Sequence, residues 1–153
     1  MTDHLLDGPE GYEISTDPAR LDGDLVHHWL STDAYWAVGR TRERHDRAVA
    51  GSLNFGLYES GSGRQAAYAR VVTDHATFAW LCDVYVARDD RGKGLGTALV
   101  EAIAGHLTPC GLTRITLATQ DAHGVYEKIG FRSLVAPEQW MTLGLMDPGP
   151  IDF

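Results

Sequence analysis

Residues 84–97 read Val84-Tyr85-Val86-Ala87-Arg88-Asp89-Asp90-Arg91-Gly92-Lys93-Gly94-Leu95-Gly96-Thr97, an apolar strand that runs into a loop with three alternating glycines. An amphipathic helix follows, because Leu95, Leu99 and Ile103 recur at a spacing of four residues. The first turn of a helix leaves backbone N–H groups without partners, and the helix dipole favours an anion there. Glycines let a ligand approach the backbone closely. The stretch therefore predicts a pyrophosphate site on the amides of residues 93–97.

Length and composition indicate an ordinary globular protein. The 153 residues are 44% hydrophobic and 22% charged, which predicts one domain over residues 1–153, with flexible tails at about 1–9 and 147–153. The net charge of -8 argues against nonspecific binding to nucleic acid or to an anionic membrane. It either suits a cationic substrate or only keeps the protein soluble.

Two cysteines, Cys82 and Cys110, show neither metal-ligand nor disulfide spacing, so we expect no metal and a reducing compartment. The N-terminus lacks a signal-peptide pattern, and no apolar run is long enough to span a bilayer. We therefore expect a cytoplasmic protein.

The order of elements predicts a mixed sheet. Hairpin-like connections favour antiparallel pairing up to residue 86, and the strand–helix–strand order after it implies one parallel pair. The strand 77–86 shows little alternation, which favours burial on both faces. The expected strands are 11–15, 53–58, 67–73, 77–86, 114–118, 131–135 and 140–145, and the expected helices are 17–30, 41–50, 95–107 and 121–128.

The glycine loop fits neither of two common nucleotide motifs. A Walker A sequence would end in Gly-Lys-Ser/Thr, which is absent. A dinucleotide fingerprint starting at Gly92 would need a glycine where Thr97 stands. What the loop does match is Arg-x-x-Gly-x-Gly, with Arg91, Gly94 and Gly96.

A second motif follows about thirty residues later, Ala122-His-Gly-Val-Tyr126-Glu-Lys-Ile-Gly130-Phe131. Together the two motifs resemble the GNAT superfamily of acetyl-CoA-dependent N-acetyltransferases, over roughly residues 10–145. The resemblance implies an α/β fold with a mixed, mostly antiparallel sheet of six to seven strands flanked by helices. It also implies that the sheet splays open at the strand ending in Val86.

The resemblance implies acetyl-CoA as the cofactor and assigns residues to it. The amides of residues 93–97, with Arg91, would hold the pyrophosphate, and the backbone of Val84 and Val86 would pair with the pantetheine arm. At position 119 the family often has asparagine, and Thr119 stands there instead. The cofactor-binding residues are thus expected to be Val84, Tyr85, Val86, Arg91, Gly92, Lys93, Gly94, Leu95, Gly96, Thr97 and Thr119.

Acetyl transfer to an amine needs a neutral nucleophile, donors for the oxyanion and a proton for the leaving thiolate. Within the motif, Tyr126 suits the last role, since a phenol is a neutral proton donor at pH 7; otherwise it packs on a short helix. Asp83 either receives the substrate ammonium, directly or through water, or forms an ion pair with an arginine such as Arg70. His75 and His123 lie near these motifs, but exposed polar roles suit both better.

The acceptor wall is expected from the first helices and their connection, with Tyr35, Trp36, Arg40 and Phe55 as candidates. Asp74 is a further substrate-binding candidate that could act as Asp83 does, although aspartate in a turn is common for local reasons. Aromatic side chains beside acidic groups suit an organic cation, although they equally suit a core. If Arg40 lines the pocket, it favours an acceptor that also has a carboxylate.

These features predict transfer of an acetyl group from acetyl-CoA to the primary amine of a small cationic molecule, by direct attack in a ternary complex. The protein is expected to act as a monomer or homodimer. One alternative is a protein or peptide amine as acceptor. Another is a non-catalytic acyl-CoA-binding sensor or interaction module, which would have no need of Tyr126.

Overall fold

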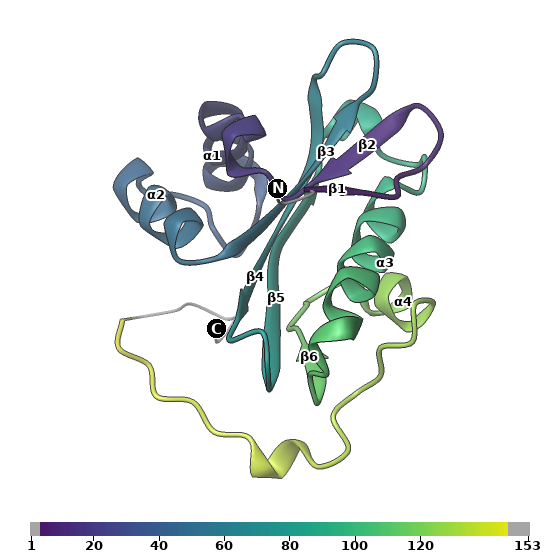
Figure 1. Cartoon of the computed structure of the whole chain (residues 1–153). Coiled ribbons are helices and arrows are strands. Elements are labelled where there is room, and N and C mark those ends of the chain that lie inside the picture. The colour runs from purple at the N-terminus through teal and green to yellow at the C-terminus, as the bar shows by residue number, and fades with distance from the viewer. Residues whose placement is uncertain (1–3, 147–153) are drawn as a thin grey trace. The chain divides into compact units, whose positions relative to one another are not determined.

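The computed structural model describes residues 4–146 and divides after Leu117 into two compact units (Figure 1). The predicted tail 147–153 lies outside the described residues. The first unit contains β1 (Leu5–Leu6), β2 (Tyr12–Ser15), η1 (Pro18–Arg20), α1 (Gly23–Asp33), α2 (Arg42–Ala50), β3 (Leu53–Glu59), β4 (Gln65–Thr73), β5 (Phe78–Val86), η2 (Arg88–Asp90), α3 (Leu95–Leu107), η3 (Thr108–Cys110) and β6 (Arg114–Thr116). The second contains α4 (His123–Glu127) and η4 (Pro137–Gln139).

The strands of the first unit form one six-stranded sheet in the order β1-β2-β3-β4-β5-β6. All neighbouring pairs are antiparallel except β5 and β6, which are parallel. The parallel pair brackets α3, as a strand–helix–strand crossover requires. The prediction of a mixed, mostly antiparallel sheet flanked by helices is confirmed.

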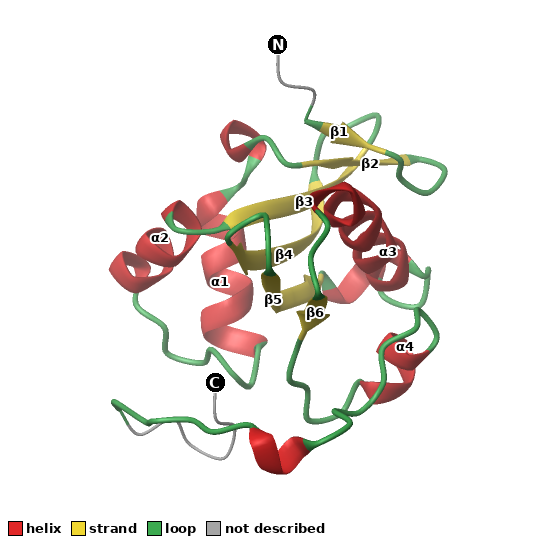
Figure 2. Cartoon of the chain, turned by 60° about the horizontal axis from the view of Figure 1, so that its bottom comes forward, coloured by secondary structure: helices red, strands yellow, loops and turns green. Residues whose placement is uncertain are grey.

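Helices cover both faces of this sheet (Figure 2). α3 packs on β3, β4 and β5, and buries the predicted apolar stripe of Leu95, Leu99 and Ile103. α1 lies on the opposite face, where the ring of Trp29 stacks on that of Tyr85 with their centroids 5.4 Å apart. Apolar burial on both faces holds β4 and β5 at the centre of the unit.

The N-terminal part differs from the prediction in two places. Leu5–Leu6 is not part of a tail, because it forms β1 and pairs with Ile14 and Ser15 of β2. The predicted helix 17–30 is a 3₁₀ turn followed by α1, which starts at Gly23 and runs through the expected break to Asp33. The Asp22 carboxylate accepts from the Leu25 N–H at 3.1 Å, so the α-helix has its N-cap there.

One strand prediction is confirmed and another is wrong. Tyr85 of β5 pairs with Tyr68 and Leu81 pairs with Val71, on opposite faces of β4, and all four side chains are buried, so β5 is buried on both faces as predicted. Segments 131–135 and 140–145 contain no strand, and only η4 interrupts an irregular path there.

Candidate active site

The N-terminus of α3 offers backbone donors without acceptors. α3 begins after Gly94, and no side chain caps its first turn. The amides of residues 95–97 therefore have no carbonyl one turn earlier to bond. Gly92 and Gly94 have φ angles of 80° and 76°, and a Cβ at either would meet no atom within 4 Å. The positive φ angles favour glycine at both positions, and the absence of side chains leaves the N–H groups open to an anion.

A buried carboxylate fixes the start of this loop. The Asp90 side chain is 2% exposed and accepts two hydrogen bonds from the Arg64 guanidinium, both at 2.9 Å. Lys93 Nζ lies 3.6 Å from the same carboxylate. The bonds from Arg64 hold the pKa of Asp90 below its usual range, so the carboxylate stays ionised. Arg64 thereby ties the loop to the connection between β3 and β4.

Replacing Asp90 with asparagine should loosen the loop. The variant keeps the side-chain shape but loses the charge that Arg64 pairs with. Because Arg64 is nearly half exposed, we expect a loss of about 1–2 kcal/mol in unfolding free energy. Urea denaturation measures it, with the exposed neighbour Asp89→Asn as the matched control. Equal stability of the two variants would show that Asp90 does not brace the loop.

The far edge of β5 is open beside this loop. β5 pairs with β6 only from Phe78 to Trp80, and beyond that point no strand of the described residues covers its edge. The Ala87 N–H donates to the Ala66 carbonyl at 2.9 Å, so the backbone groups of Val86 face the other way, toward the open edge. An extended amide chain fits such an edge as an added strand.

Arg91 lies at the junction of the edge and the loop. Its Nε donates to the Val86 carbonyl at 2.9 Å, and its Nη2 lies 3.3 Å from Asp33 of α1. Asp33 also pairs with Arg88 and accepts from the Tyr85 hydroxyl at 2.6 Å. The hydrogen bond from Arg88, followed by that from Tyr85, lowers the pKa of Asp33. The contacts with Val86 and Asp33 thus hold Arg91 within reach of the loop. The contact with Asp33 could not be predicted from the sequence, because Asp33 is far from Arg91 along the chain.

Tyr85, one of the expected cofactor-binding residues, is placed differently from Val84 and Val86. It is paired with Tyr68 of β4 rather than facing the open edge. Its ring is buried against Trp29. The structure therefore assigns Tyr85 to the core of the α1 face, where its hydroxyl fixes Asp33.

A β-bulge interrupts β5 one residue before Val84. Tyr68 pairs with Tyr85 but Arg70 pairs with Cys82, so β5 has two residues opposite one of β4. Asp83 is one of the two and has a φ of 54°, in the left-handed region. Bulges re-aim side chains and interrupt pairing, and here the bulge coincides with the strand segment that borders the open edge.

The Asp83 carboxylate is buried in a network of donors. Arg40 donates to both of its oxygens, at 2.7 and 3.2 Å, and Arg70 Nε donates at 2.9 Å. The Trp36 indole adds a bond of 2.8 Å. Burial raises the pKa of Asp83, but the bonds and charges of Arg40 and Arg70 outweigh burial, and the net pKa is lowered.

The sequence left two interpretations of Asp83, a group that receives the substrate ammonium or a partner in an ion pair. The structure contains the ion pair with Arg70, and Arg40 adds a second ion pair. The side chain is 2% exposed, and each oxygen already accepts two hydrogen bonds. A carboxylate offers about four lone-pair sites. A substrate ammonium would have to displace an arginine to reach it.

An Asp83→Asn variant should lose about 2–4 kcal/mol of stability at pH 7, since two guanidiniums would remain with no carboxylate. The sign of the pH dependence follows from the lowered pKa: the stabilisation is present above the unfolded-state value of ~4 and is lost as pH falls through the folded-state value. Denaturation curves of both proteins should converge in acid. A gap in stability that stays constant below pH 4 would contradict the ionised network.

The acceptor candidates separate into two groups. Trp36 and Arg40 meet at Asp83, and the Tyr35 ring lies edge-on against Trp36 with centroids 4.9 Å apart. Phe55 is 0% exposed and packs under α3, with its ring 5.7 Å from that of His106. It lies in the core on the α3 face, so its assignment to an acceptor wall is not supported.

Asp74 also lies away from this group, in the turn between β4 and β5. Its carboxylate accepts from the Thr77 hydroxyl and from the backbone amides of Ala76, Thr77 and Phe78. Those bonds, led by the one from the Thr77 hydroxyl, lower its pKa. The side chain is occupied in closing the turn, which is a common local use of aspartate.

The second unit carries Thr119 and Tyr126. The Thr119 hydroxyl accepts from the Ala122 N–H at 3.1 Å, immediately before α4. Tyr126 is half-buried in α4, and its ring lies edge-on to that of Phe131 with centroids 5.7 Å apart. The Phe131 N–H donates to the Tyr126 carbonyl at 3.1 Å. Together these contacts give Tyr126 a defined local setting.

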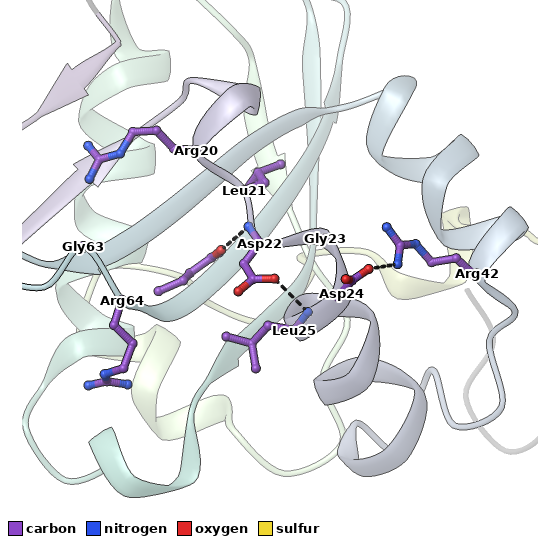
Figure 3. Close-up of a pocket in the computed structure, with 10 residues that line it drawn as sticks. Arg20, Leu21, Asp22, Gly23, Asp24, Leu25, Arg42, Gly63 and Arg64 are labelled. Atoms are coloured by element: carbon purple, nitrogen blue, oxygen red, sulfur yellow. Dashed lines mark hydrogen bonds and ion pairs between the residues drawn. The ribbon is translucent and has the colours of Figure 1, made fainter.

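A pocket of about 490 Å³ at the start of α1 is a poor candidate for the site (Figure 3). Its charged side chains already have partners. Asp22 caps α1 and Asp24 pairs with Arg42, as the dashed lines in Figure 3 mark. Arg64 pairs with Asp90, which lies outside the pocket. These contacts indicate a structural role for the pocket.

The described residues 4–146 lack two kinds of feature, a cluster of metal ligands and a helix able to span a membrane. No group of three or more His, Cys, Asp or Glu side chains is placed to hold a metal ion within that range. No helix in the same range has the length and apolar character needed to cross a membrane.

A helix start with uncapped amide donors, an open strand edge and a bulge thus adjoin along one continuous stretch of chain. The sequence model of the acetyltransferase (GNAT) family matches residues 23–131, which include this whole stretch and the Tyr126 segment. The chain belongs to this family.

Individual relatives agree with that assignment. A Gibberella zeae protein named as an acetyltransferase is 30% identical over 135 residues, 76% of each chain. A GNAT-family crystal structure from Xanthomonas campestris pv. campestris is 41% identical, with a TM-score of 0.83 over 91% of this chain and 96% of that one. Serotonin N-acetyltransferase 2, chloroplastic, of Oryza sativa subsp. japonica is 35% identical over 96 residues, 60% of this chain and 48% of the rice protein.

Proposed function

We propose that the protein transfers an acetyl group from acetyl-CoA to the primary amine of a small molecule that is cationic as its ammonium form. The observation that carries the proposal is the continuity of the open β5 edge with the amide donors at the start of α3. Pyrophosphate suits the donors of residues 95–97, and the amides of a pantetheine arm suit the edge at Val84 and Val86. Membership of the GNAT family supports the same assignment.

Bound acetyl-CoA would supply the thioester, and the chain's residues would bind and orient it. In the proposed step the amine nitrogen forms a bond to the acetyl carbon and the carbon–sulfur bond breaks. Tyr126 gives a proton or a hydrogen bond to the departing sulfur, since its phenol is protonated at neutral pH. The ammonium loses one proton to water before the attack, and the nitrogen loses a second proton to water as the amide forms, because Asp83 has no free lone pair with which to take either. Water then returns to Tyr126 any proton that it gave to the sulfur.

Thr119 and Lys93 have supporting roles in this proposal. The Thr119 oxygen accepts from the Ala122 amide, so its own hydroxyl proton remains available to a cofactor carbonyl. The Lys93 ammonium adds positive charge beside the amides, although the Asp90 carboxylate shares it. A small-molecule acceptor is favoured over a peptide, because the rice relative carries the name of a small amine's acetyltransferase.

Initial-rate kinetics with free-thiol release as the signal test the proposal. Acetyl-CoA and an amine are varied together over a panel of amino acids, arylalkylamines, polyamines, aminoglycosides and peptides. Direct attack in a ternary complex predicts intersecting double-reciprocal lines. Parallel lines would indicate an acetylated enzyme instead, and binding of acetyl-CoA without turnover of any amine would favour a sensor.

A further inference from the structure

The cluster of Arg40, Arg70 and Asp83 has an uneven charge. Two guanidiniums share one carboxylate, and the side chains of Arg40 and Arg70 are each 15% exposed. The cluster sits at the β5 bulge, one residue before the Val84 edge. If acetyl-CoA lies along that edge, as proposed above, the cluster borders the place where the acceptor must lie.

The groups around the cluster do not balance its charge. Burial raises the pKa of Cys82 to about 11 and also raises that of Tyr68, so both are neutral. Burial, followed by the proximity of His27 and Arg40, lowers the pKa of His45, which favours its neutral form. The carboxylate of Asp46 is exposed and pairs with Arg42 on its own helix. The cluster therefore keeps a net charge of +1 in a largely buried place, which is unfavourable without an anion.

The cluster also keeps unused donors. An arginine has five N–H groups. Arg40 uses two of them on Asp83, and Arg70 uses one on Asp83 and one on the Ser52 hydroxyl at 3.0 Å. Three N–H groups of each side chain have no acceptor among the described residues. The carboxylate and the Trp36 indole hold the guanidiniums in place, so the remaining donors are preorganised.

We infer that the acceptor carries a carboxylate in addition to its amine, and that Arg40 and Arg70 bind this carboxylate. One carboxylate neutralises the net charge of +1 and matches the planar donors of a guanidinium. A dianionic phosphate would reverse the charge of the cluster. A polyamine or aminoglycoside would add positive charge beside it, which costs binding free energy. The substrate class is thus that of amino acids and related zwitterions.

Matched acceptor pairs test this inference with the wild-type protein. Each pair is an amino acid and its carboxamide, taken from α-amino acids and from the series glycine, β-alanine and 4-aminobutyrate. Phosphoethanolamine, tryptamine and spermidine complete the panel. We expect kcat/KM to be at least about tenfold higher for the acid than for its amide in the preferred pair. The length of the preferred acid then reports the distance from the guanidiniums to the reacting carbon.

Variants of the two arginines test which residues cause the preference for an acid over its amide. Arg40→Gln and Arg70→Gln should each bring the acid-to-amide ratio of kcat/KM toward one. A general structural defect would lower both rates and leave their ratio unchanged. Arg47→Gln removes an exposed charge from α2 outside the cluster and should keep the wild-type ratio. Thermal unfolding of each variant shows that the comparison is made between folded proteins.

Four outcomes would overturn the inference. The first two are equal or faster turnover of the amides, and a preference for spermidine, tryptamine or phosphoethanolamine. The others are a ratio that both glutamine variants leave unchanged, and no turnover of any carboxylate-bearing acceptor. Calorimetry with acetyl-CoA keeps the two proposals apart. Absence of acetyl-CoA binding contradicts the proposed function, whereas binding with turnover of carboxylate-free amines contradicts only the acceptor class.

Discussion

A Gly94→Glu variant is expected to bind acetyl-CoA at least about a hundredfold more weakly than the wild type. The new carboxylate would stand at the start of α3, where the unpaired amides and the helix dipole favour an anion. It would occupy the place of the pyrophosphate and repel it. The φ of 76° at Gly94 adds backbone strain for any side chain. Isothermal titration calorimetry measures the loss.

Gly111→Glu is the matched control for this variant. Gly111 has a φ of 71° and open space around its Cβ direction, but it follows the far end of α3. The Gly111→Glu variant therefore introduces the same charge and a similar backbone strain away from the proposed site. Acetyl-CoA affinity should stay within about threefold of the wild type. Tight binding by Gly94→Glu, or equal weakening in both variants, would contradict the assignment of the pyrophosphate to this helix start.

A Tyr126→Phe variant is expected to lower kcat by about 10²–10³-fold, in the range typical of a lost general acid. Only the hydroxyl is removed, so the edge-on contact with Phe131 and the structure of α4 should persist. The affinity for acetyl-CoA should change by less than about threefold. A general acid gives the kcat profile an alkaline limb, and this limb should flatten in the variant.

Tyr12→Phe removes a hydroxyl from a half-buried tyrosine of β2 and serves as the control. It should leave kcat and the pH profile unchanged. A Tyr126→Phe enzyme with wild-type kcat and the same pH profile would remove Tyr126 from the mechanism. A loss of acetyl-CoA affinity that matches the loss of kcat/KM would instead make it a binding residue.

The strand–loop–helix could be predicted from the sequence because its determinants are local. Gly92 and Gly94 mark a backbone conformation with positive φ. The recurrence of Leu95, Leu99 and Ile103 every four residues predicts the buried face of the helix. The antiparallel order of β3, β4 and β5 likewise followed from short connections between alternating segments. These features need no knowledge of distant partners.

The sequence-based predictions were wrong where contacts with residues distant in the chain determine the structure. Phe55 alternates correctly in β3, but alternation does not say which helix covers its face. The pattern of residues 131–145 suits a strand, yet a strand also needs a paired neighbour, and within the described residues none forms. Leu5–Leu6 shows the opposite error. Two residues are too few to show an alternating pattern, yet they form a strand because they pair with β2.

Asp83 shows the same limit within the site. The sequence required a partner for a carboxylate in an apolar strand and suggested Arg70. The contribution of Arg40 and Trp36 depends on how the segment after α1 crosses the sheet, which no local pattern encodes. This difference changes the role assigned to Asp83. Its carboxylate is not free to bind a substrate ammonium but is the counter-ion that orients two arginines.

A titration of the ¹⁵N-labelled protein with acetyl-CoA, followed by amide chemical shifts, tests directly whether the β5 edge and the start of α3 bind this cofactor. Acetyl-CoA should cause saturable shifts of the amides of residues 94–97 and of Val84 and Val86. Gly111 should be unaffected, and so should Gly23 and Asp24, which line the pocket in Figure 3 at the start of α1. Saturable shifts confined to that pocket, or no shifts at all, would contradict the claim that this strand edge and helix start bind acetyl-CoA.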